Sequence, residues 1–361
     1  MKRNYHRTIL IIAALAAVTA ANAASWRINS DAAKHAHFSD INAAMSSDAV
    51  VDGDTLYLDP GSKLTTQQNV TKRVTIIGCG HTTAGRPYEY ATITGGLYLK
   101  ADNIKVEAIY INSRTQIEAC NITVERCRCG FITYGGTLAQ RATIRQCYVL
   151  NRIYGPGGNS SVTKRLNTAY WTIENCIIIV SSTYHSIYGL YKAVIRNNYI
   201  KQNYNNLSYQ PLSNLKECTV TNNIILKTGG SYWNYVYRAN SLTDGNIFQH
   251  NVMSNKGANF YYSSTYYNTF QKDKNILLGS ADEAAVFALA GSNDELYRLK
   301  DSSPAKGCAD DGGDCGPYGG LYPYVPGGIP QGMPVPVTAT VPSNAQDGHI
   351  RISIQTTIQK Q

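Results

Sequence analysis

The acidic residues of the central region are the first candidates for chemistry, because hydrolysis of a glycosidic bond needs two carboxylates facing each other across a short gap. A calcium ion likewise needs several carboxylate or carbonyl oxygens that converge on one point. Between positions 103 and 278 the acids are scattered, with no adjacent or alternating pair: Glu107, Glu118, Glu125, Glu174, Glu217, Asp244 and Asp273. This distribution argues against a two-carboxylate hydrolytic site and against a calcium site in that region.

Three further acids, Asp310, Asp311 and Asp314, lie close together near the C-terminus, in a glycine-rich stretch. Such a loop could hold Ca²⁺, and a plain glycine turn is the alternative. No motif elsewhere requires a cofactor. His185 and His250 have no partner at catalytic spacing, and we expect both to be structural.

Tyrosine is the one residue type in clear excess, with 27 tyrosines against 6 phenylalanines and 3 tryptophans. A flat ring with a polar tip can pack on the C–H face of a sugar while neighbouring amides bond its hydroxyls. The alternative is that tyrosine simply favours strands. The candidate carbohydrate-binding residues are Tyr184, Tyr188, Tyr204, Tyr232, Trp233, Tyr235, Tyr261 and Tyr262.

A short motif that recurs through the centre of the chain must position these residues. It reads branched apolar, two mostly polar residues, Cys or Asn, any residue, apolar. The copies are 124–129, 144–149, 173–178, 195–200, 220–225 and 248–253. A spacing of 20 to 29 residues between copies is typical of a solenoid, whose coils bury their apolar faces against one another.

Each position of the motif predicts an environment. The first and last positions are apolar and mostly β-branched, which indicates inward faces of stacked strands. The second position alternates in charge over four copies, as Glu125, Arg145, Glu174 and Arg196. We expect an outward ladder of ion pairs, each contributing roughly 0.2 to 1 kcal/mol.

The fourth position predicts a structural ladder along the solenoid axis. A buried Asn costs free energy unless its amide is paired, and stacked Asn residues can satisfy one another. Cys fills the same small space as a weakly polar residue. The ladder residues are Cys127, Cys147, Cys176, Asn198, Asn223 and Asn251.

This pattern resembles the right-handed parallel β-helix, or pectin-lyase-like, superfamily, in which ladders of Asn and small residues stack at a bend between strands. The resemblance covers residues 70–300 and implies a fold rather than a function. The opening and closing segments are similar to those of secreted β-helix proteins common in Bacteroidetes. The expected fold is all-β: a right-handed parallel β-helix solenoid with an N-terminal helical cap and a short C-terminal β tail.

The chain divides into four expected parts. Residues 1–23 have the basic start, short apolar core and Ala-x-Ala end of a signal peptide, which predicts a secreted, periplasmic or cell-surface protein. Residues 24–60 should form the cap, with a helix that begins near Ser39 or Asp40, and the first strand. Residues 61–330 should form the β-helix with its closing segment, and residues 331–361 a β tail.

The cysteines and the charge limit the partners. Most of the nine cysteines fall in strand-like segments and read as buried thiols, whereas Cys308 and Cys315 flank a loop and could close into a disulfide. The net charge of +9 is compatible with an acidic polysaccharide or with simple solubility. No stretch is long and apolar enough for a transmembrane segment, and no motif indicates nucleic-acid binding.

Three functions remain open. The favoured one is that the chain is an exported protein, non-catalytic or degenerate, that recognises a polysaccharide. This polysaccharide can carry acidic groups. The first alternative is an active uronate lyase. Polysaccharide lyases with a parallel β-helix fold use a Lys or Arg base to remove the proton next to the carboxylate of a uronate. The second alternative is a structural or adhesive surface protein.

Overall fold

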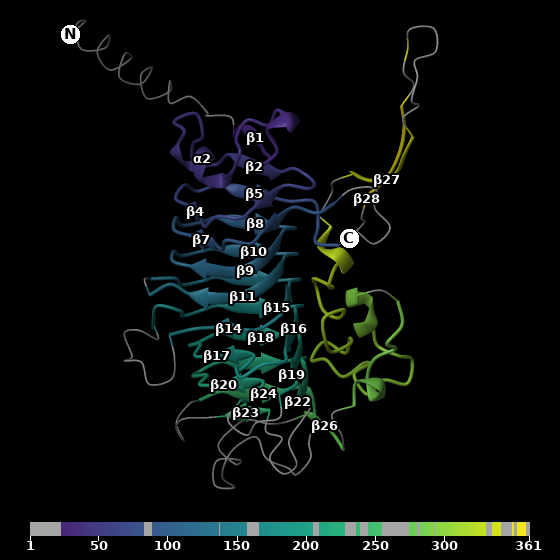
Figure 1. Ribbon diagram of the computed structural model, residues 1–361. Helices are drawn as coiled ribbons and strands as arrows, with labels where there is room; N and C mark the ends of the chain where they lie inside the picture. The colour runs from purple at the N-terminus through teal and green to yellow at the C-terminus, as the bar shows by residue number, and fades with distance from the viewer. Residues whose placement is uncertain are drawn as a thin grey trace, which may run out of the picture.

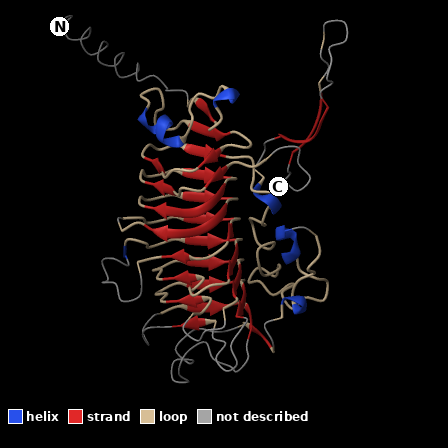
Figure 2. Cartoon of the chain, in the orientation of Figure 1, coloured by secondary structure: helices blue, strands red, loops and turns tan. Residues whose placement is uncertain are grey.

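A computed structural model of the chain shows a solenoid of parallel strands whose coils stack from the N-terminal end downward (Figures 1 and 2). The structure describes residues 23–82, 89–136, 138–156, 166–204, 209–227, 236–238, 245–254, 274–279, 282–291, 293–329, 334–340, 349 and 352–358. Residues 1–22, which are all but the last residue of the expected signal peptide, lie outside this set. Within it, no helix has the length and apolar character needed to span a membrane.

The solenoid has three walls, and each coil contributes a strand to them in turn. The first wall is a ten-stranded parallel sheet. Its strands are β1 (Ser25–Ile28), β2 (Thr55–Leu58), β5 (Thr75–Ile77), β8 (Lys105–Glu107), β10 (Thr123–Glu125), β12 (Thr143–Arg145), β15 (Thr172–Glu174), β18 (Val194–Arg196), β21 (Thr219–Thr221) and β24 (Ile247–Gln249).

The second and third walls are joined, because the long strands β9 (Tyr110–Ile117) and β11 (Arg128–Tyr134) run through both. The other strands of the second wall are β3 (Lys63–Leu64), β6 (Thr92–Ile93), β13 (Tyr148–Val149), β16 (Ile177–Val180), β19 (Tyr199–Gln202), β22 (Ile224–Lys227), β25 (Val252–Ser254) and β26 (Ile276–Leu278). Those of the third wall are β4 (Gln68–Val70), β7 (Leu97–Leu99), β14 (Ile153–Tyr154), β17 (Ile187–Tyr188), β20 (Leu212–Ser213) and β23 (Tyr237–Arg238).

The inward columns of the motif form the core, as the sequence predicts. In the first wall, Val124 pairs with Ile144, Ile144 with Ile173, and the column continues in register. Every member of the two columns is fully buried. They are Val124, Ile144, Ile173, Ile195, Val220 and Phe248, and Cys129, Val149, Ile178, Ile200, Ile225 and Met253. Each such side chain contributes about 1.5 to 3 kcal/mol of hydrophobic stabilisation when fully buried.

The fourth column is a continuous hydrogen-bonded ladder at the bend between the first and second walls. The backbone N of Asn198 donates to Asn223 Oδ1 at 2.9 Å, and that of Asn223 to Asn251 Oδ1 at 3.0 Å. Each Asn Nδ2 also donates to a carbonyl of the preceding coil, such as Ile195 O for Asn223. Cys176 takes the same position, with its thiol directed at Ile144 O. A small polar donor is therefore what this bend requires.

The residue before each ladder residue, and the residue at the same bend in the preceding and the following coil, has a left-handed backbone, which the sequence did not reveal. The φ angles lie between 52° and 62°. These bend residues are Ala108, Arg126, Gln146, Asn175, Asn197, Asn222, His250 and Lys274. Asn is the side chain that best tolerates this conformation, which explains why it is frequent in the column.

The N-terminal end is covered by the helix α2 (Ile41–Ser46), which begins after Asp40. Asp40 Oδ1 accepts a hydrogen bond from Ala43 N at 2.7 Å, and Gln68 Oε1 accepts from Ile41 N at 3.0 Å. Ile41, Ala44 and Met45 are buried against the first coils. The helix thus covers apolar groups that a solenoid end would otherwise expose.

After β26 the chain turns back and climbs along the solenoid; we call the described residues 282–329 the closing segment (Figure 1). It contains the short 3-10 helices η2 (Glu283–Ala285), η3 (Asn293–Tyr297) and η4 (Pro326–Gly328). Phe287 and Tyr324 belong to an apolar cluster with outward residues of the second wall, such as Tyr199 and Ile224. The segment therefore covers a wall that would otherwise be an exposed apolar surface.

The bend residues hold the closing segment in place, one coil at a time. Five of them donate side-chain hydrogen bonds to the segment. The contacts, from the last coils upward, are His250 Nδ1 to Cys308 O (3.0 Å), Asn222 Nδ2 to Asp310 Oδ1 (2.6 Å), Asn175 Nδ2 to Gly319 O (2.6 Å), Gln146 Nε2 to Pro323 O (2.6 Å) and Arg126 Nη1 to Ile329 O (3.1 Å).

The tail is a two-stranded antiparallel ribbon of β27 (Pro334–Thr340) and β28 (Ser353–Ile358), drawn apart from the coils in Figure 1. Ile352 and Ile354 are more than half exposed. A short C-terminal β tail is therefore present, as expected for residues 331–361.

Candidate functional site

Aromatic residues gather on the outside of the third wall, over three successive coils. Tyr154 on β14 pairs in register with Tyr188 on β17, and their rings stack with centroids 4.5 Å apart. His185 stacks on the same tyrosine, Tyr188, at 5.3 Å. The parallel walls create this column, because equivalent residues of adjacent coils lie about 4.8 Å apart, close to the separation of stacked rings.

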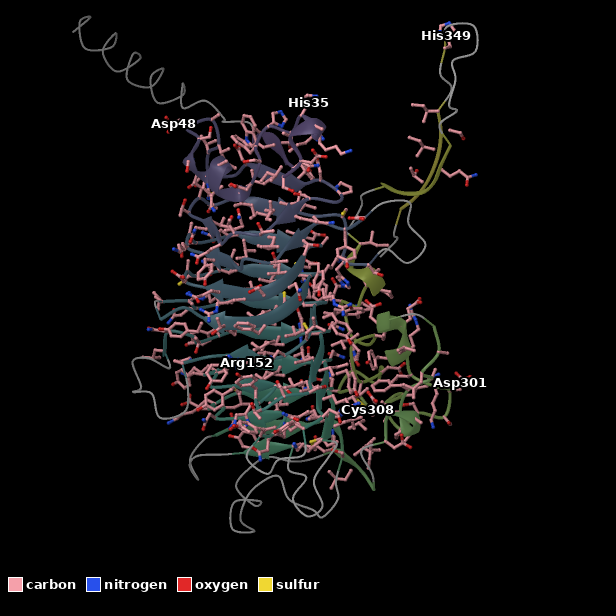
Figure 3. The ribbon with its side chains drawn as sticks, in the orientation of Figure 1. His35, Asp48, Arg152, Asp301, Cys308 and His349 are labelled. Atoms are coloured by element: carbon pink, nitrogen blue, oxygen red, sulfur yellow. A yellow bond between two sulfur atoms is a disulfide. The ribbon has the colours of Figure 1, made fainter. Side chains whose placement is uncertain are left out.

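Arg152 lies beside these rings, in the lower half of the solenoid as drawn in Figure 3. Its guanidinium carbon is 3.6 Å from the ring centroid of Tyr184 and 5.3 Å from those of Tyr154 and Phe131. Cation–π contacts of this kind are worth about 0.5 to 2 kcal/mol and restrict the side chain to one orientation. Arg152 Nε has no hydrogen-bond partner among the described residues.

Two more tyrosines extend the aromatic group. Tyr209 lies 5.6 Å from His185 and 6.3 Å from Tyr204, between ring centroids. We call Tyr154, Tyr184, His185, Tyr188, Tyr204 and Tyr209, with Arg152 and Phe131, the aromatic face.

The structure thus brings Tyr184, Tyr188 and Tyr204 together, three of the residues that the sequence proposes for carbohydrate binding. The other five, Tyr232, Trp233, Tyr235, Tyr261 and Tyr262, lie outside the described residues. The sequence missed Arg152, Tyr154 and His185 as members of the face. The available signal was the pairing of an arginine with a tyrosine two residues later, just after a ladder motif.

Burial changes the acid–base properties of two residues at this face. Burial raises the pKa of Tyr154, and the stacked Tyr188 adds to this. Burial lowers the pKa of Lys227, at the end of β22, to about 8. Lys227 Nζ donates to the backbone oxygen of Tyr204 at 2.7 Å, so a lysine of near-neutral pKa lies directly behind the aromatic face.

The charged ladder of the first wall is a separate feature. Arg145 is 3.1 Å from Glu125, and Arg196 is 2.7 Å from Glu174, as the alternating motif predicts. The carboxylate side chains are only 4 to 5% exposed. Tyr322 of the closing segment stacks on Arg145 at 4.1 Å.

The surrounding cations determine the ionisation of Glu125. Burial raises the pKa of Glu125, but the charges of Lys105, Arg145 and Arg126 outweigh it, so the pKa is lowered overall. The neighbouring cations therefore favour the charged form of the Glu125 carboxylate, which has a structural role.

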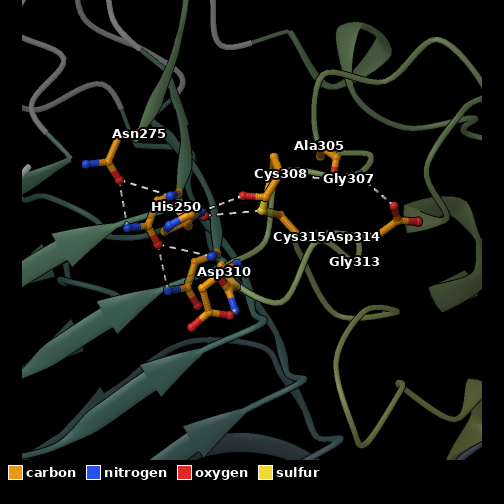
Figure 4. Close-up of a disulfide and its surroundings, with 12 residues drawn as sticks. His250, Asn275, Ala305, Gly307, Cys308, Asp310, Gly313, Asp314 and Cys315 are labelled. Carbon is orange, nitrogen blue, oxygen red and sulfur yellow. Dashed lines mark hydrogen bonds between the residues drawn. A yellow bond between two sulfur atoms is a disulfide. The ribbon is translucent and has the colours of Figure 1, made fainter. Parts of the chain in front are cut away.

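The acidic loop near the C-terminus is organised by its own hydrogen bonds (Figure 4). A disulfide joins Cys308 and Cys315, the pair that the sequence singles out. Asp310 accepts from Asn222, Asp311 accepts from Gly313 N at 2.8 Å, and Asp314 from Gly307 N at 3.0 Å. Across the described residues, no three His, Cys, Asp or Glu side chains form a group that could hold a metal ion.

No protein-family profile and no curated protein sequence matches the chain. Solved structures similar to it include a polygalacturonate lyase fused with a self-assembling amphipathic peptide, with a TM-score of 0.41 and 11% identity over 79% of this chain and 88% of that one. A pectin methylesterase in complex with a hexasaccharide has a TM-score of 0.35 and 14% identity over 80% and 95% of the two chains. A Bacillus subtilis pectate lyase mutant has a TM-score of 0.36 and 10% identity over 83% and 93%. At these identities the likeness concerns the fold alone.

Proposed function

We propose that this protein binds a polysaccharide at the aromatic face and does not cleave it. The observation that carries the proposal is the guanidinium of the half-buried Arg152, held among Phe131, Tyr154 and Tyr184. A guanidinium fixed in this way can bind hydroxyl or acid groups of a ligand with little loss of side-chain entropy.

The tyrosines of the face would act mainly through their edges and hydroxyls. The faces of Tyr154 and Tyr188 are turned toward each other, and one face of Tyr184 is covered by Arg152. Hydroxyl groups of a sugar would therefore meet phenol oxygens and guanidinium N–H groups. This chemistry suits a polar, hydroxyl-rich polymer, and its cation favours one with acidic groups.

The carboxylates of the central coils support a binding role rather than catalysis. Glu125 and Glu174 are paired with arginines on the first wall, away from the aromatic face. Glu118, on the third wall, accepts a hydrogen bond from Gln116 at 2.7 Å. Hydrolysis of a glycosidic bond would need two carboxyl groups on either side of the ligand.

A second candidate function, uronate elimination, is favoured by one observation. The lowered pKa of Lys227 would let the amine act as a base near neutral pH, and its Nζ contacts Tyr204 of the aromatic face. In that reaction the base removes the proton next to the uronate carboxylate, and the leaving sugar oxygen departs as a double bond forms.

We place the proposed activity outside the cytoplasm. The pattern of residues 1–23 is that of a signal peptide, and the Cys308–Cys315 disulfide is compatible with an oxidising compartment.

The test is affinity electrophoresis of the mature protein in gels containing alginate, pectate, hyaluronan, xylan or dextran, with ultraviolet absorbance recorded for unsaturated product. We expect retardation by at least one polymer without product. Arg152→Ala should abolish the retardation. Arg141→Ala is the matched control, because Arg141 also stands over a tyrosine, Tyr170, at 5.8 Å, but in the turn that enters the first wall.

Each other result has a definite meaning. Product that disappears in Lys227→Met would establish the lyase instead. Neither retardation nor product with any polymer would contradict the proposal and favour a structural or adhesive role. Equal losses in Arg152→Ala and Arg141→Ala would show that binding depends on net charge rather than on this face.

A further inference from the structure

The outward residues of the third wall form a straight line across five coils. Tyr98 pairs in register with Gln116, Gln116 with Thr133, Thr133 with Tyr154, and Tyr154 with Tyr188. We call these five residues the axial stripe. Four steps of about 4.8 Å give it a length on the order of 19 Å parallel to the solenoid axis. All five are half-buried, so each presents part of its side chain to solvent.

The stripe extends the aromatic face toward the N-terminal end and is polar along its whole length. It carries three phenols, one amide and one hydroxyl, all of which can exchange hydrogen bonds with sugar hydroxyls. Gln116 is held in a defined orientation, since its Oε1 accepts from Arg114 Nη1 at 3.1 Å and its Nε2 donates to Glu118 Oε1 at 2.7 Å. The stripe is therefore an ordered row of polar groups rather than a set of loose side chains.

Cations border the stripe at several levels. Lys100 stands 5.8 Å from the ring of Tyr98, Arg114 is 5.5 Å from the ring of Phe131, and Arg152 lies beside Tyr154. Glu118, the hydrogen-bond partner of Gln116, is the one acid among the residues named for the stripe and its border. The charge along this border is thus complementary to a polymer that carries acid groups as well as hydroxyls.

We infer that the ligand of this face is an extended linear glycan that lies along the solenoid axis, with successive sugar units against successive coils. The inference rests on the proposed function and adds the direction and extent of binding. Adjacent coils are about 4.8 Å apart, which is close to the length that one sugar ring adds to an extended chain. One straight chain can therefore contact the stripe at several successive coils. A compact ligand would instead touch only Arg152 and its surrounding rings.

Chain-length dependence distinguishes these two geometries. The probes are size-fractionated oligosaccharides of alginate and of xylan, from disaccharide to octasaccharide, titrated into the mature protein by calorimetry. Affinity should rise with length until the chain spans the stripe from Tyr188 to Tyr98, and then level off. Tyr98→Ala should weaken the longest oligosaccharides about fivefold and leave the disaccharide and trisaccharide unchanged.

The matched control is Tyr57→Ala, since Tyr57 is also a half-buried outward tyrosine, but on β2 of the first wall. It should leave all lengths unchanged. Affinity that is already maximal for the disaccharide, or an octasaccharide that binds Tyr98→Ala as well as the natural protein, would overturn the axial inference while the proposed function stands. If neither the oligosaccharides nor the parent polymers of the wider panel bind, the proposed function fails and the inference with it.

Discussion

Asn222 and Asp310 exchange two hydrogen bonds across the junction between the solenoid and the closing segment. Asn222 Nδ2 donates to Asp310 Oδ1 at 2.6 Å, and Asp310 N donates to Asn222 Oδ1 at 3.1 Å. Asn222 also has a φ of 59°, so one residue both forms the bend and holds the segment. The two roles can be separated by substitution.

Replacing Asn222 by Ala should remove both contributions. We expect the free energy of unfolding to fall by about 2 to 3 kcal/mol, from the left-handed backbone and the two lost hydrogen bonds together. Asn222→Gly keeps the backbone freedom and should lose only about 1 kcal/mol from the hydrogen bonds. Chemical denaturation measures both, and equal losses would show that the backbone conformation contributes nothing.

Replacing Asn223 by Leu should break the ladder in its middle. The Asn223 side chain accepts from Asn198 N through Oδ1 and donates from Nδ2 to Asn251 Oδ1 and Ile195 O. These groups lose their partner in the variant, so the protein should be destabilised by about 1 to 3 kcal/mol. Asn112→Leu, at an exposed position on β9, should change stability by less than about 0.5 kcal/mol. An unchanged melting temperature for the Asn223 variant would disprove the structural role of the ladder.

Replacing Lys227 by Met should change stability in a pH-dependent way. The pKa of Lys227 is lowered to about 8, below the usual value of about 10.4 in an unfolded chain, so the protonated amine opposes folding below pH 8. The variant should be more stable than the natural protein by about 1 to 2 kcal/mol at pH 7, and the difference should shrink as the pH rises from about 8 to 10.4. Lys34→Met, in the exposed helix η1 (Ala32–Lys34), is the control and should show no such trend.

Replacing Glu125 by Gln tests the charged ladder. The pKa of Glu125 is lowered, so its carboxylate stabilises the fold above the unfolded pKa of about 4.3, and this stabilisation is lost as the pH falls through the folded pKa. Glu125→Gln should cost about 1 to 3 kcal/mol at pH 7 and progressively less below pH 4. Glu217→Gln removes a more exposed partner of Lys192 and should cost under about 1 kcal/mol at any pH. Thermal melts at several pH values would reveal a constant difference if the network had no electrostatic role.

The sequence was sufficient to predict the first two walls, because their residues repeat at fixed positions around the ladder. Val124, Cys127 and Cys129 occupy the same places in their coil as Ile195, Asn198 and Ile200 do in theirs. The ion pairs between coils followed from the same repeat. Periodicity of this kind directly reports stacked side chains.

The third wall and the aromatic face were harder to predict. Apart from β9 and β11 its strands are short, and segments of unequal length separate Tyr154 and Tyr188 from the ladder residues of their coils. Their common register is therefore hidden in the sequence and appears only when the coils are stacked. Arg152 was missed for the same reason, since its partner Tyr184 comes from the next coil.

The contacts of the closing segment have a kinetic consequence. Arg126 bonds to Ile329, 203 positions later in the chain, so this contact cannot form until residue 329 has been synthesised. Contacts of such high sequence separation form slowly. Until the segment docks, the second wall exposes Ile177, Tyr199 and Ile224 as a flat apolar surface with a β-rich backbone. The nascent protein is therefore prone to aggregate until the closing segment has been made and has docked, and a truncation at residue 280 would fix it in that vulnerable state.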